Sequence, residues 1–324
     1  MPLQTARDSH LDLRHHAPPG VRRRARLVVV GREVELIVNA RASGTGGPAA
    51  VVGRATSVLR DAGARVRAHV TADEQELAAA VGGAAGRRLV LVGGDGTVHA
   101  LANLDVAPLP PAALLPAGRA NNIARALGIP IDWEAAARLA VRGRPATLDA
   151  LHVDTPQRSL YAVEGVSAGF HAAARHRYTG ENSGDLAAGV RALATELGAF
   201  RQRPVTLRLD GARAFDAPAA QVFLANLPLF GFGFHVDPLA DPSDGRLEAI
   251  VLEAATRRRV VRLLAATRDG RHLERHGVSW RRGVRAQLEQ PLPLVADAQP
   301  LGVTTATVTV AAGHLRVVAP EGRR

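Results

Sequence analysis

The stretch Arg88-Leu-Val-Leu-Val-Gly-Gly-Asp-Gly-Thr97 decides how the first half of this chain folds. Residues 89–92 are wholly apolar, which is typical of a strand buried on both faces of a parallel sheet. Gly93-Gly94-Asp95-Gly96 then breaks the run, and helical spacing resumes at Thr97. A strand, a glycine turn and a helix start in this order predict a loop that presents backbone amides to a phosphate group.

Asp95 gives the same turn a further chemical function. The glycines let the backbone approach an anion closely, and a carboxylate at this position is suited to hold Mg²⁺ beside the anion or to orient a hydroxyl group. The alternative is a plain Asp-Gly turn without a ligand. The buried strand, the glycines and the embedded acid together favour the binding of a nucleotide phosphate.

Strands and helices alternate around this turn. Further apolar runs predict strands at residues 33–39, 64–70 and 112–115, and helical spacing predicts helices at 51–62, 73–81 and 123–128. This alternation is typical of an α/β fold with a doubly wound parallel sheet. In such a sheet the ligand lies beyond the carboxyl ends of the strands.

From about residue 147 the pattern changes to short, often alternating apolar runs, which predict an antiparallel, β-sandwich-like domain. The predicted strands are residues 148–153, 159–166, 205–209, 222–227, 246–252, 277–280, 284–288, 292–296 and 306–310. Helices are predicted at 185–200 and 256–268. We therefore expect a disordered basic extension (1–24), an α/β domain (25–146) and a β-rich domain (147–324) whose C-terminal segment can pack back on the first domain.

Composition narrows the classes of function. The chain has 324 residues and a net charge of +11, from 41 basic and 30 acidic residues, and every basic residue is Arg. Because Lys is absent, the sequence excludes a Walker-type phosphate loop, a protein-kinase lysine and a Schiff base. Because Cys is absent, it excludes disulfides, thiolate metal sites and a cysteine nucleophile.

The positive charge reflects either an arginine-for-lysine bias or contact with anions, since a strongly basic surface suits anionic membranes or nucleic acid. Aromatic residues make up only 3% of the chain, which leaves few stacking platforms for nucleic acid. The sequence shows neither a transmembrane run nor the apolar core of a signal peptide. We therefore expect a cytoplasmic protein that binds the inner face of an anionic membrane peripherally, without a nucleic-acid partner.

Motifs in both halves of the chain carry a family resemblance. The first half contains Asn39 with Ser43-Gly44, Gly94-Asp95-Gly96-Thr97, and Leu115-Pro-Ala-Gly-Arg-Ala-Asn-Asn-Ile-Ala-Arg-Ala-Leu-Gly128. The second half contains Ser167-Ala-Gly-Phe170, Gly231-Phe-Gly-Phe-His-Val-Asp-Pro238, Asp244-Gly-Arg-Leu-Glu248 and Ala296-Asp-Ala-Gln299. In this order they resemble the diacylglycerol kinase and sphingosine kinase superfamily, in particular its small bacterial lipid kinases. NAD kinases are less similar, because the Leu-Pro-x-Gly segment does not belong to them.

The resemblance implies phosphoryl transfer from ATP to the hydroxyl group of a lipid substrate, with Mg²⁺. It implies that the nucleotide lies between an α/β domain and a β-sandwich-like domain. The residues it assigns to the nucleotide are Asn39, Ser43, Gly94, Asp95, Gly96, Thr97 and Gly118. The hydroxyl groups of Ser43 and Thr97 are suited to donate to phosphate oxygens, and their alternative role is turn and helix capping.

Two motifs depart from the family pattern. The family has Gly-Thr-x-Asn-Asp where this chain has Gly118-Arg-Ala-Asn-Asn122, so Arg119 replaces a Thr and Asn122 replaces an Asp. The family's Asp-Gly-Glu motif is Asp297-Ala298-Gln299 here, and an amide cannot accept a proton at neutral pH. The candidate catalytic residues are thus Asp95, Asn122, Asp297 and Gln299, and Arg119 is a candidate phosphate clamp in a chain without Lys.

These substitutions leave two hypotheses. General-base catalysis contributes roughly 10²–10⁴ in rate, whereas phosphoryl transfer depends mainly on positioning and charge neutralisation, so the sequence is compatible with a slow kinase. The alternative is an inactive protein of the same fold that binds nucleotide or lipid and acts as a regulator. The sequence leaves open the lipid, the nucleotide preference and the oligomeric state, a homodimer included.

Two further features have alternative interpretations. A Pro- and Gly-rich loop fits either a structural divalent ion or turn-forming Asx hydrogen bonds, and its acids are Asp237, Asp241 and Asp244. The predicted helix at 185–200 suits either core packing or an acyl-chain pocket. Its apolar stripe consists of Leu186, Val190, Leu193, Leu197 and Phe200.

Overall fold

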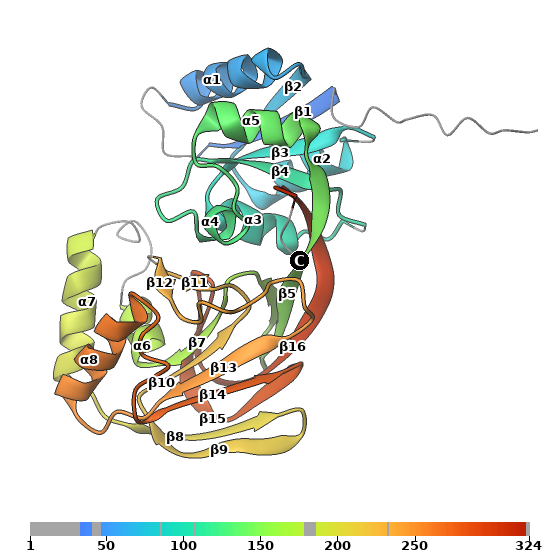
Figure 1. Cartoon of the computed structure of the whole chain (residues 1–324). Coiled ribbons are helices and arrows are strands. Elements are labelled where there is room, and N and C mark those ends of the chain that lie inside the picture. The colour runs from blue at the N-terminus through green and yellow to red at the C-terminus, as the bar shows by residue number, and fades with distance from the viewer. Residues whose placement is uncertain are drawn as a thin grey trace, which may run out of the picture.

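The structure is a computed structural model that describes residues 33–40, 47–84, 86–106, 108–177, 186–231 and 233–321. The predicted basic extension and Ser43 lie outside these residues. Figure 1 shows an α/β part, which contains the first half of the chain, and a β-rich part, which contains most of the second half. Among the described residues, no helix is long and apolar enough to span a membrane.

The α/β part is built on parallel strands in the order β4-β3-β1-β2. These strands are β1 (Glu33–Asn39), β2 (Arg65–Thr71), β3 (Arg88–Gly93) and β4 (Ala112–Pro116). One face is covered by α1 (Gly47–Asp61) and α5 (Trp133–Arg142). The other is covered by α2 (Glu74–Gly82), α3 (Asp95–Ala102) and α4 (Asn122–Ala126). Helices on both faces confirm the predicted doubly wound fold.

Helix α5 was not predicted from the sequence. Its apolar residues follow helical spacing, and its buried face consists of Ala136, Ala137, Ala140 and Val141. Asp132 caps its first turn by accepting a hydrogen bond from the amide of Ala135 at 2.9 Å. The small side chains let α5 lie close to β4 and α1.

The β-rich part is antiparallel and follows the order β14-β13-β10-β7-β15-β16, with the hairpin β8–β9 beside β15. Its strands include β6 (Ser159–Ala162), β7 (Gly165–Gly169), β8 (Arg203–Leu209), β9 (Ala212–Ala219), β10 (Gln221–Ala225), β13 (Leu247–Leu252), β14 (Val278–Gly283) and β15 (Arg285–Ala296). One face packs against α6 (Phe170–His176), α7 (Leu186–Gly198) and α8 (Arg257–Thr267). The other face buries a second cluster, in agreement with the predicted sandwich-like architecture.

Two long strands, β5 (Arg144–Asp154) and β16 (Gln299–Ala319), run through both parts (Figure 1). They pair with each other, and Val317 of β16 also pairs in parallel with Ala112 of β4. Among the described residues, all strands but the short pair β11–β12 therefore belong to one sheet. This connection fixes the carboxyl ends of β1, β3 and β4 relative to the turns of the β-rich part.

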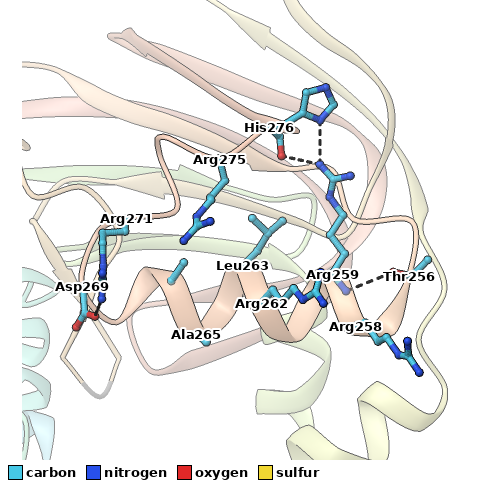
Figure 2. Close-up of a pocket in the computed structure, with 11 residues that line it drawn as sticks. Thr256, Arg258, Arg259, Arg262, Leu263, Ala265, Asp269, Arg271, Arg275 and His276 are labelled. Carbon is cyan, nitrogen blue, oxygen red and sulfur yellow. Dashed lines mark hydrogen bonds and ion pairs between the residues drawn. The ribbon is translucent and has the colours of Figure 1, made fainter.

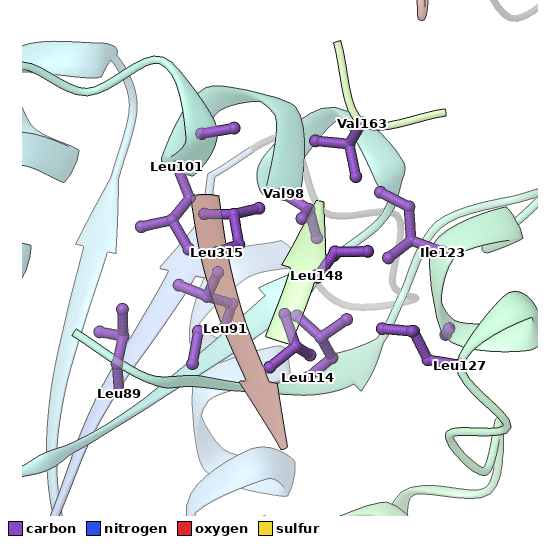
Figure 3. Close-up of a cluster of buried hydrophobic side chains, with 14 of the residues drawn as sticks. Leu89, Leu91, Val98, Leu101, Leu114, Ile123, Leu127, Leu148, Val163 and Leu315 are labelled. Carbon is purple, nitrogen blue, oxygen red and sulfur yellow. The ribbon is translucent and has the colours of Figure 1, made fainter. Parts of the chain in front are cut away.

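The core of the α/β part includes the end of the chain. Figure 3 shows Leu315 of β16 among Leu89 and Leu91 of β3 and Val98 and Leu101 of α3, all of them buried. Burying a side chain of this size stabilises the folded state by about 1.5–3 kcal/mol. The last strand thus contributes to the packing on which the glycine turn after β3 rests.

The predicted strand at 159–166 is wrong, because the structure has two strands there. β6 ends at Ala162 and β7 begins at Gly165. Between them, the amides of Val163 and Glu164 donate to the carboxylate of Asp297 instead of to a neighbouring strand. A side chain thus takes the place of a strand partner and interrupts the pairing.

The predicted apolar stripe of the helix at 185–200 is only partly buried. Val190 and Leu193 are 59% and 40% exposed, whereas Ala192 and Glu196 are buried. Leu197 and Phe200 do pack against the core, and the ring of Phe200 lies edge-on to Phe170 at 6.0 Å. The core-packing interpretation is therefore wrong for the middle of α7, which turns Ala192 and Glu196 inward and packs against α6.

Candidate active site

The glycine turn after β3 has the geometry that the sequence predicts. Gly93 ends β3, Gly94 is the N-cap of α3, and Asp95 is the first helical residue. A Cβ atom at Gly93 would lie 2.1 Å from Oγ1 of Thr97, so glycine is required there. Thr97 is buried beneath the turn, while Gly96 is exposed in the first turn of the helix. The N-terminus of α3 is thus open to an anion.

The loop after β4 lies directly on this turn. The amide of Ala117 donates to the carbonyl of Gly93 at 2.9 Å, and a Cβ at Gly94 would lie 2.7 Å from Cα of Gly118. Asn121 adopts the left-handed conformation with φ 51°. Its side chain accepts from the amide of Gly118 at 2.9 Å and donates to the carbonyl of Gly118 at 2.8 Å. The two backbones are therefore in direct contact.

We predict that Gly94→Ala destabilises the protein by about 1–3 kcal/mol, the usual cost of overpacking. Its new methyl group would meet Cα of Gly118, which cannot move without displacing Asn121. Thermal unfolding should show a lower midpoint. Gly53→Ala in α1 is the matched control, because a Cβ there meets nothing within 4 Å, and it should be neutral or slightly stabilising. Equal melting temperatures for both variants would contradict the tight contact.

Asp95 joins α3 to the start of α4. Its Oδ1 accepts a hydrogen bond from the amide of Ile123 at 2.9 Å, and the amide of Asn122 contributes a further one. Burial raises the pKa of the Asp95 carboxyl above its ordinary value, and the nearby charge of Asp297 adds a smaller effect in the same direction. The carboxylate is thus fixed in position but costly to keep charged without a cation.

Asp297 holds three segments together. It lies in the turn between β15 and β16 with φ 49°. Its Oδ1 accepts from the amides of Glu164 and Gly165 at 2.8 and 3.1 Å, and its Oδ2 accepts from the amide of Val163 at 2.8 Å. Nδ1 of His99, on α3, lies 2.8 Å from the same Oδ2. Both oxygens are therefore occupied by the protein itself.

Glu164 is a site residue that the sequence analysis missed. It lies between β6 and β7 and is only 6% exposed. Its Oε2 accepts hydrogen bonds from Nδ2 of Asn122 and from the amide of Gly231, both at 3.0 Å. Burial raises the pKa of Glu164 well above its ordinary value, and the charges of Asp95 and Asp297 raise it further. The available signal was a single acid within an apolar run.

Asn122 is fully buried between the two parts of the molecule. Besides contacting Glu164, its Nδ2 donates to the carbonyl of Gly231 at 2.6 Å. Its Oδ1 has no hydrogen-bond partner among the described residues. An unpaired buried oxygen costs about 1–3 kcal/mol, so this atom is suited to accept a hydrogen bond from a ligand.

The remaining predicted residues lie around this centre. Asn39 ends β1, and Arg119 is exposed in the loop before α4, so the carboxyl ends of β1, β3 and β4 bring the predicted nucleotide contacts together. Gln299 is exposed at the start of β16, two residues after Asp297. His99, like Glu164, was not singled out from the sequence.

The acidic loop uses its carboxylates for local hydrogen bonds. Asp241 accepts from the amide and hydroxyl of Ser243 at 3.0 and 2.7 Å, and Asp237 accepts from the amide of Leu239 at 2.9 Å and from Trp280 Nε1 at 2.5 Å. No cluster of three or more potential metal ligands occurs among the described residues. The Asx-turn interpretation describes this loop.

Comparisons with known proteins place this geometry in a class. A model of the diacylglycerol kinase catalytic domain matches residues 33–153, and a model of the YegS C-terminal NAD kinase beta sandwich-like domain matches residues 164–319. A putative diacylglycerol kinase from Bacillus anthracis shares the fold, with a TM-score of 0.70 at 19% identity over 90% of this chain and 98% of that one.

Individual relatives give the family. A diacylglycerol kinase of Mycobacterium tuberculosis is 30% identical over 264 residues, which cover 76% of this chain and 80% of the relative. A probable lipid kinase YegS-like protein of Chromohalobacter salexigens is 29% identical, over 84% of this chain and 89% of the relative. The chain belongs to the diacylglycerol kinase-like lipid kinase superfamily, which confirms the resemblance found in its motifs.

Proposed function

We propose that this protein transfers the γ-phosphoryl group of ATP to a hydroxyl group of a lipid, with Mg²⁺. The observation that supports this most is the direct backbone contact between the glycine turn and the Gly118 loop, beside the carboxylate of Asp95. At the exposed Gly96 a Cβ would meet nothing within 4 Å, which leaves room for phosphate oxygens at the N-terminus of α3. Asn39, Ser43, Gly96, Thr97 and Arg119 would complete the nucleotide site.

Asp95 fits the role of Mg²⁺ ligand. Mg²⁺ prefers hard oxygen ligands and is commonly held by one or two carboxylates together with substrate phosphates, so a site with few protein ligands is sufficient. Burial raises the pKa of Asp95, and a divalent cation would offset this cost of the charged form. When bound, the ion would neutralise charge on the transferring phosphoryl group.

Glu164 is our candidate for the general base. It is the buried carboxylate next to Asn122, the position where the family pattern has an acid, and its pKa is raised, as suits a base that works near neutral pH. In the proposed step Glu164 accepts the hydroxyl proton while the hydroxyl oxygen bonds to the γ-phosphorus. The bond from that phosphorus to the β–γ bridging oxygen breaks, and ADP leaves with its electron pair.

The other acids and amides then have supporting roles. Asp297 is a positioning residue, because its hydrogen bonds hold Glu164 and His99 in place. Gln299 is exposed and available to hydrogen-bond the substrate hydroxyl.

We also propose a cytoplasmic setting with peripheral binding to the inner membrane face. The second candidate function, an inactive regulator, is favoured by the amide at Gln299.

The test is incubation with radiolabelled ATP and Mg²⁺ and a panel of diacylglycerols, sphingoid bases and whole lipid extract. We expect label in a chloroform-soluble product from at least one lipid. Heat-denatured protein is the control for label that transfers without catalysis. ATP binding without label in any lipid would contradict the kinase proposal and support the regulator.

A further inference from the structure

A groove rich in arginine lies beside α8, on the same part of the fold as α7 (Figures 1 and 2). Its volume is about 940 Å³, and α8 and the segment after it provide the lining side chains. The charged residues among them are Arg258, Arg259, Arg262, Arg271, Arg275 and the single acid Asp269. We call this feature the arginine groove; with five arginines against one aspartate, it is strongly positive.

Part of this charge is not neutralised by the protein. Arg271 pairs with Asp269 at 2.8 Å, and Arg259 donates to the carbonyl of His276 at 2.5 Å (Figure 2). Arg258, Arg262 and Arg275 are exposed, and their side chains have no hydrogen-bond or ion-pair partner among the described residues. Guanidinium groups bind phosphate oxygens in a bidentate manner and are less strongly hydrated than ammonium groups. The groove therefore suits an anion that carries phosphate.

Two exposed apolar side chains lie on α8 or on a loop that contacts the segment after it. Leu239 is 84% exposed, and its neighbour Pro238 packs against Gly270, since a Cβ at Gly270 would lie 2.3 Å from Cγ of Pro238. Val261, on the outer side of α8 between Arg258 and Arg262, is 48% exposed. A cationic surface with exposed aliphatic tips is the combination that an interfacial helix uses at a lipid headgroup layer.

The segment just before Pro238 and Leu239 contacts the candidate active site. The short strands β11 (Leu229–Phe230) and β12 (Phe234–His235) form a hairpin. The amide of Gly231, which follows β11, donates a hydrogen bond to Glu164. On the other side, Nδ1 of His235 contacts the carbonyl of Arg268 at the end of α8 at 2.8 Å. One hairpin thus connects the arginine groove with the place where, under the proposed function, a lipid hydroxyl must arrive.

We propose that the arginine groove and the exposed tip at Leu239 form the surface by which this protein docks on anionic phospholipid membranes. Phospholipid phosphates occupy the groove, and Leu239 enters the boundary between headgroups and acyl chains. This assignment rests on charge complementarity, since each basic residue near an anionic bilayer contributes about 1 kcal/mol to membrane binding. The surface deepens the proposed function by naming its partner, yet docking can be measured without any turnover.

The test is co-sedimentation of the full chain with vesicles of phosphatidylcholine alone or mixed with phosphatidylglycerol. The variant Arg258→Gln/Arg262→Gln/Arg275→Gln should bind the mixed vesicles roughly 100-fold more weakly, from about fivefold per arginine. The matched control, Arg60→Gln/Arg138→Gln/Arg142→Gln, removes the same charge from exposed positions on α1 and α5. We expect this control to stay within about fivefold of the wild type, and thermal melts will establish that both variants fold.

Two further measurements distinguish docking on a membrane from binding of a free phosphate compound. Leu239→Ser should weaken the binding that remains at high salt, where screening removes most of the electrostatic part. Soluble glycerol phosphate at millimolar concentration should not displace the protein from vesicles; displacement would assign the groove to a free phosphate compound instead. Equal losses in the two triple variants would overturn the docking surface, whereas failure of the radiolabel assay with normal vesicle binding would overturn only the kinase proposal.

Discussion

Glu164→Gln is expected to lower kcat by roughly 10²–10⁴, the usual contribution of a general base, while the affinity for Mg²⁺-ATP changes little. Gln keeps the shape of the side chain and one acceptor oxygen for the amide of Gly231, but it cannot take a proton. Single-turnover and steady-state kinetics, with ATP affinity from calorimetry, measure the two effects separately. Wild-type kcat in this variant would exclude Glu164 as the base.

The pH dependence gives an independent readout. Because burial raises the pKa of Glu164, kcat/KM of the wild type should rise as pH passes through this raised value, and Glu164→Gln should lose that limb. The free energy of unfolding should change in the opposite direction, falling as pH rises. The folded state binds the proton more tightly than the unfolded state, so stability falls as pH rises from about 4.5, the ordinary value, to the raised one. Glu164→Gln should remove the part of this decline that Glu164 contributes, while the buried carboxyls of Asp95 and Glu248, whose pKa values are also raised, keep theirs.

A substitution that puts a carboxylate at position 122 tests the pairing of Asn122 with Glu164. Asn122→Asp alone would place two carboxylates where Nδ2 of Asn122 now lies 3.0 Å from Oε2 of Glu164, and like charges at that distance cannot both stay ionised. We expect this single variant to be less active and less stable than the wild type. In Asn122→Asp/Glu164→Gln the hydrogen bond is reversed and one acid remains, so kcat should recover well above that of Glu164→Gln. If kcat of the double variant does not recover, an acid at position 122 cannot replace the acid at position 164.

The substitution Gln299→Glu, together with Ala298→Gly, tests the rival position for the base. Gln299 is exposed, and if Glu164 already accepts the proton, the new acid should change kcat by less than about tenfold. A gain of roughly 100-fold or more would instead assign the missing base to position 299. This outcome would also leave Asn122 and Glu164 with a purely structural role.

Local chemistry made much of the fold and part of the site predictable. The apolar run before Gly93 and the glycines after it specify a buried strand and a turn without help from distant residues. The boundaries of β1, β3 and β4 follow from such runs, whereas β2 alternates between apolar and polar residues. Helix α5 was missed although its apolar residues follow helical spacing and Asp132 caps its first turn. The exposed middle of α7 could not be foreseen, since its burial depends on where the helix packs.

The carboxylate network is a consequence of long-range pairing. Asp297 receives its amide hydrogen bonds from residues 132 to 134 positions earlier in the chain, and Glu164 meets Asn122 across 42 positions. No spacing rule connects such residues, because their approach depends on how β7, β15 and β16 are ordered in the sheet. Substitutions at Asn122 and Gln299 are visible in the sequence, whereas a carboxylate at Glu164 that faces one of them is visible only in the fold.

Asp95→Asn is expected to weaken Mg²⁺-ATP binding strongly while the fold remains intact. Asn retains an oxygen that can accept the hydrogen bond from the amide of Ile123, so the junction of α3 and α4 is kept. The variant should melt at the wild-type temperature or above it, because burial raises the pKa of Asp95 and makes its charge costly in the folded state.

The expected loss in Mg²⁺-ATP affinity is roughly 10²–10³-fold, about 3–4 kcal/mol, because the negative charge that would hold the cation is gone. Calorimetry with ATP in the presence of Mg²⁺ or EDTA measures it: the wild type should bind in the micromolar to millimolar range only with Mg²⁺, and Asp95→Asn should show the same weak binding in both. Asp61→Asn, an exposed acid at the end of α1, controls for net charge. A Mg²⁺-dependent affinity that survives in Asp95→Asn would show that another residue holds the ion. No heat from the folded wild type with millimolar Mg²⁺-ATP would remove the nucleotide site altogether, and with it both the kinase and the nucleotide-binding regulator.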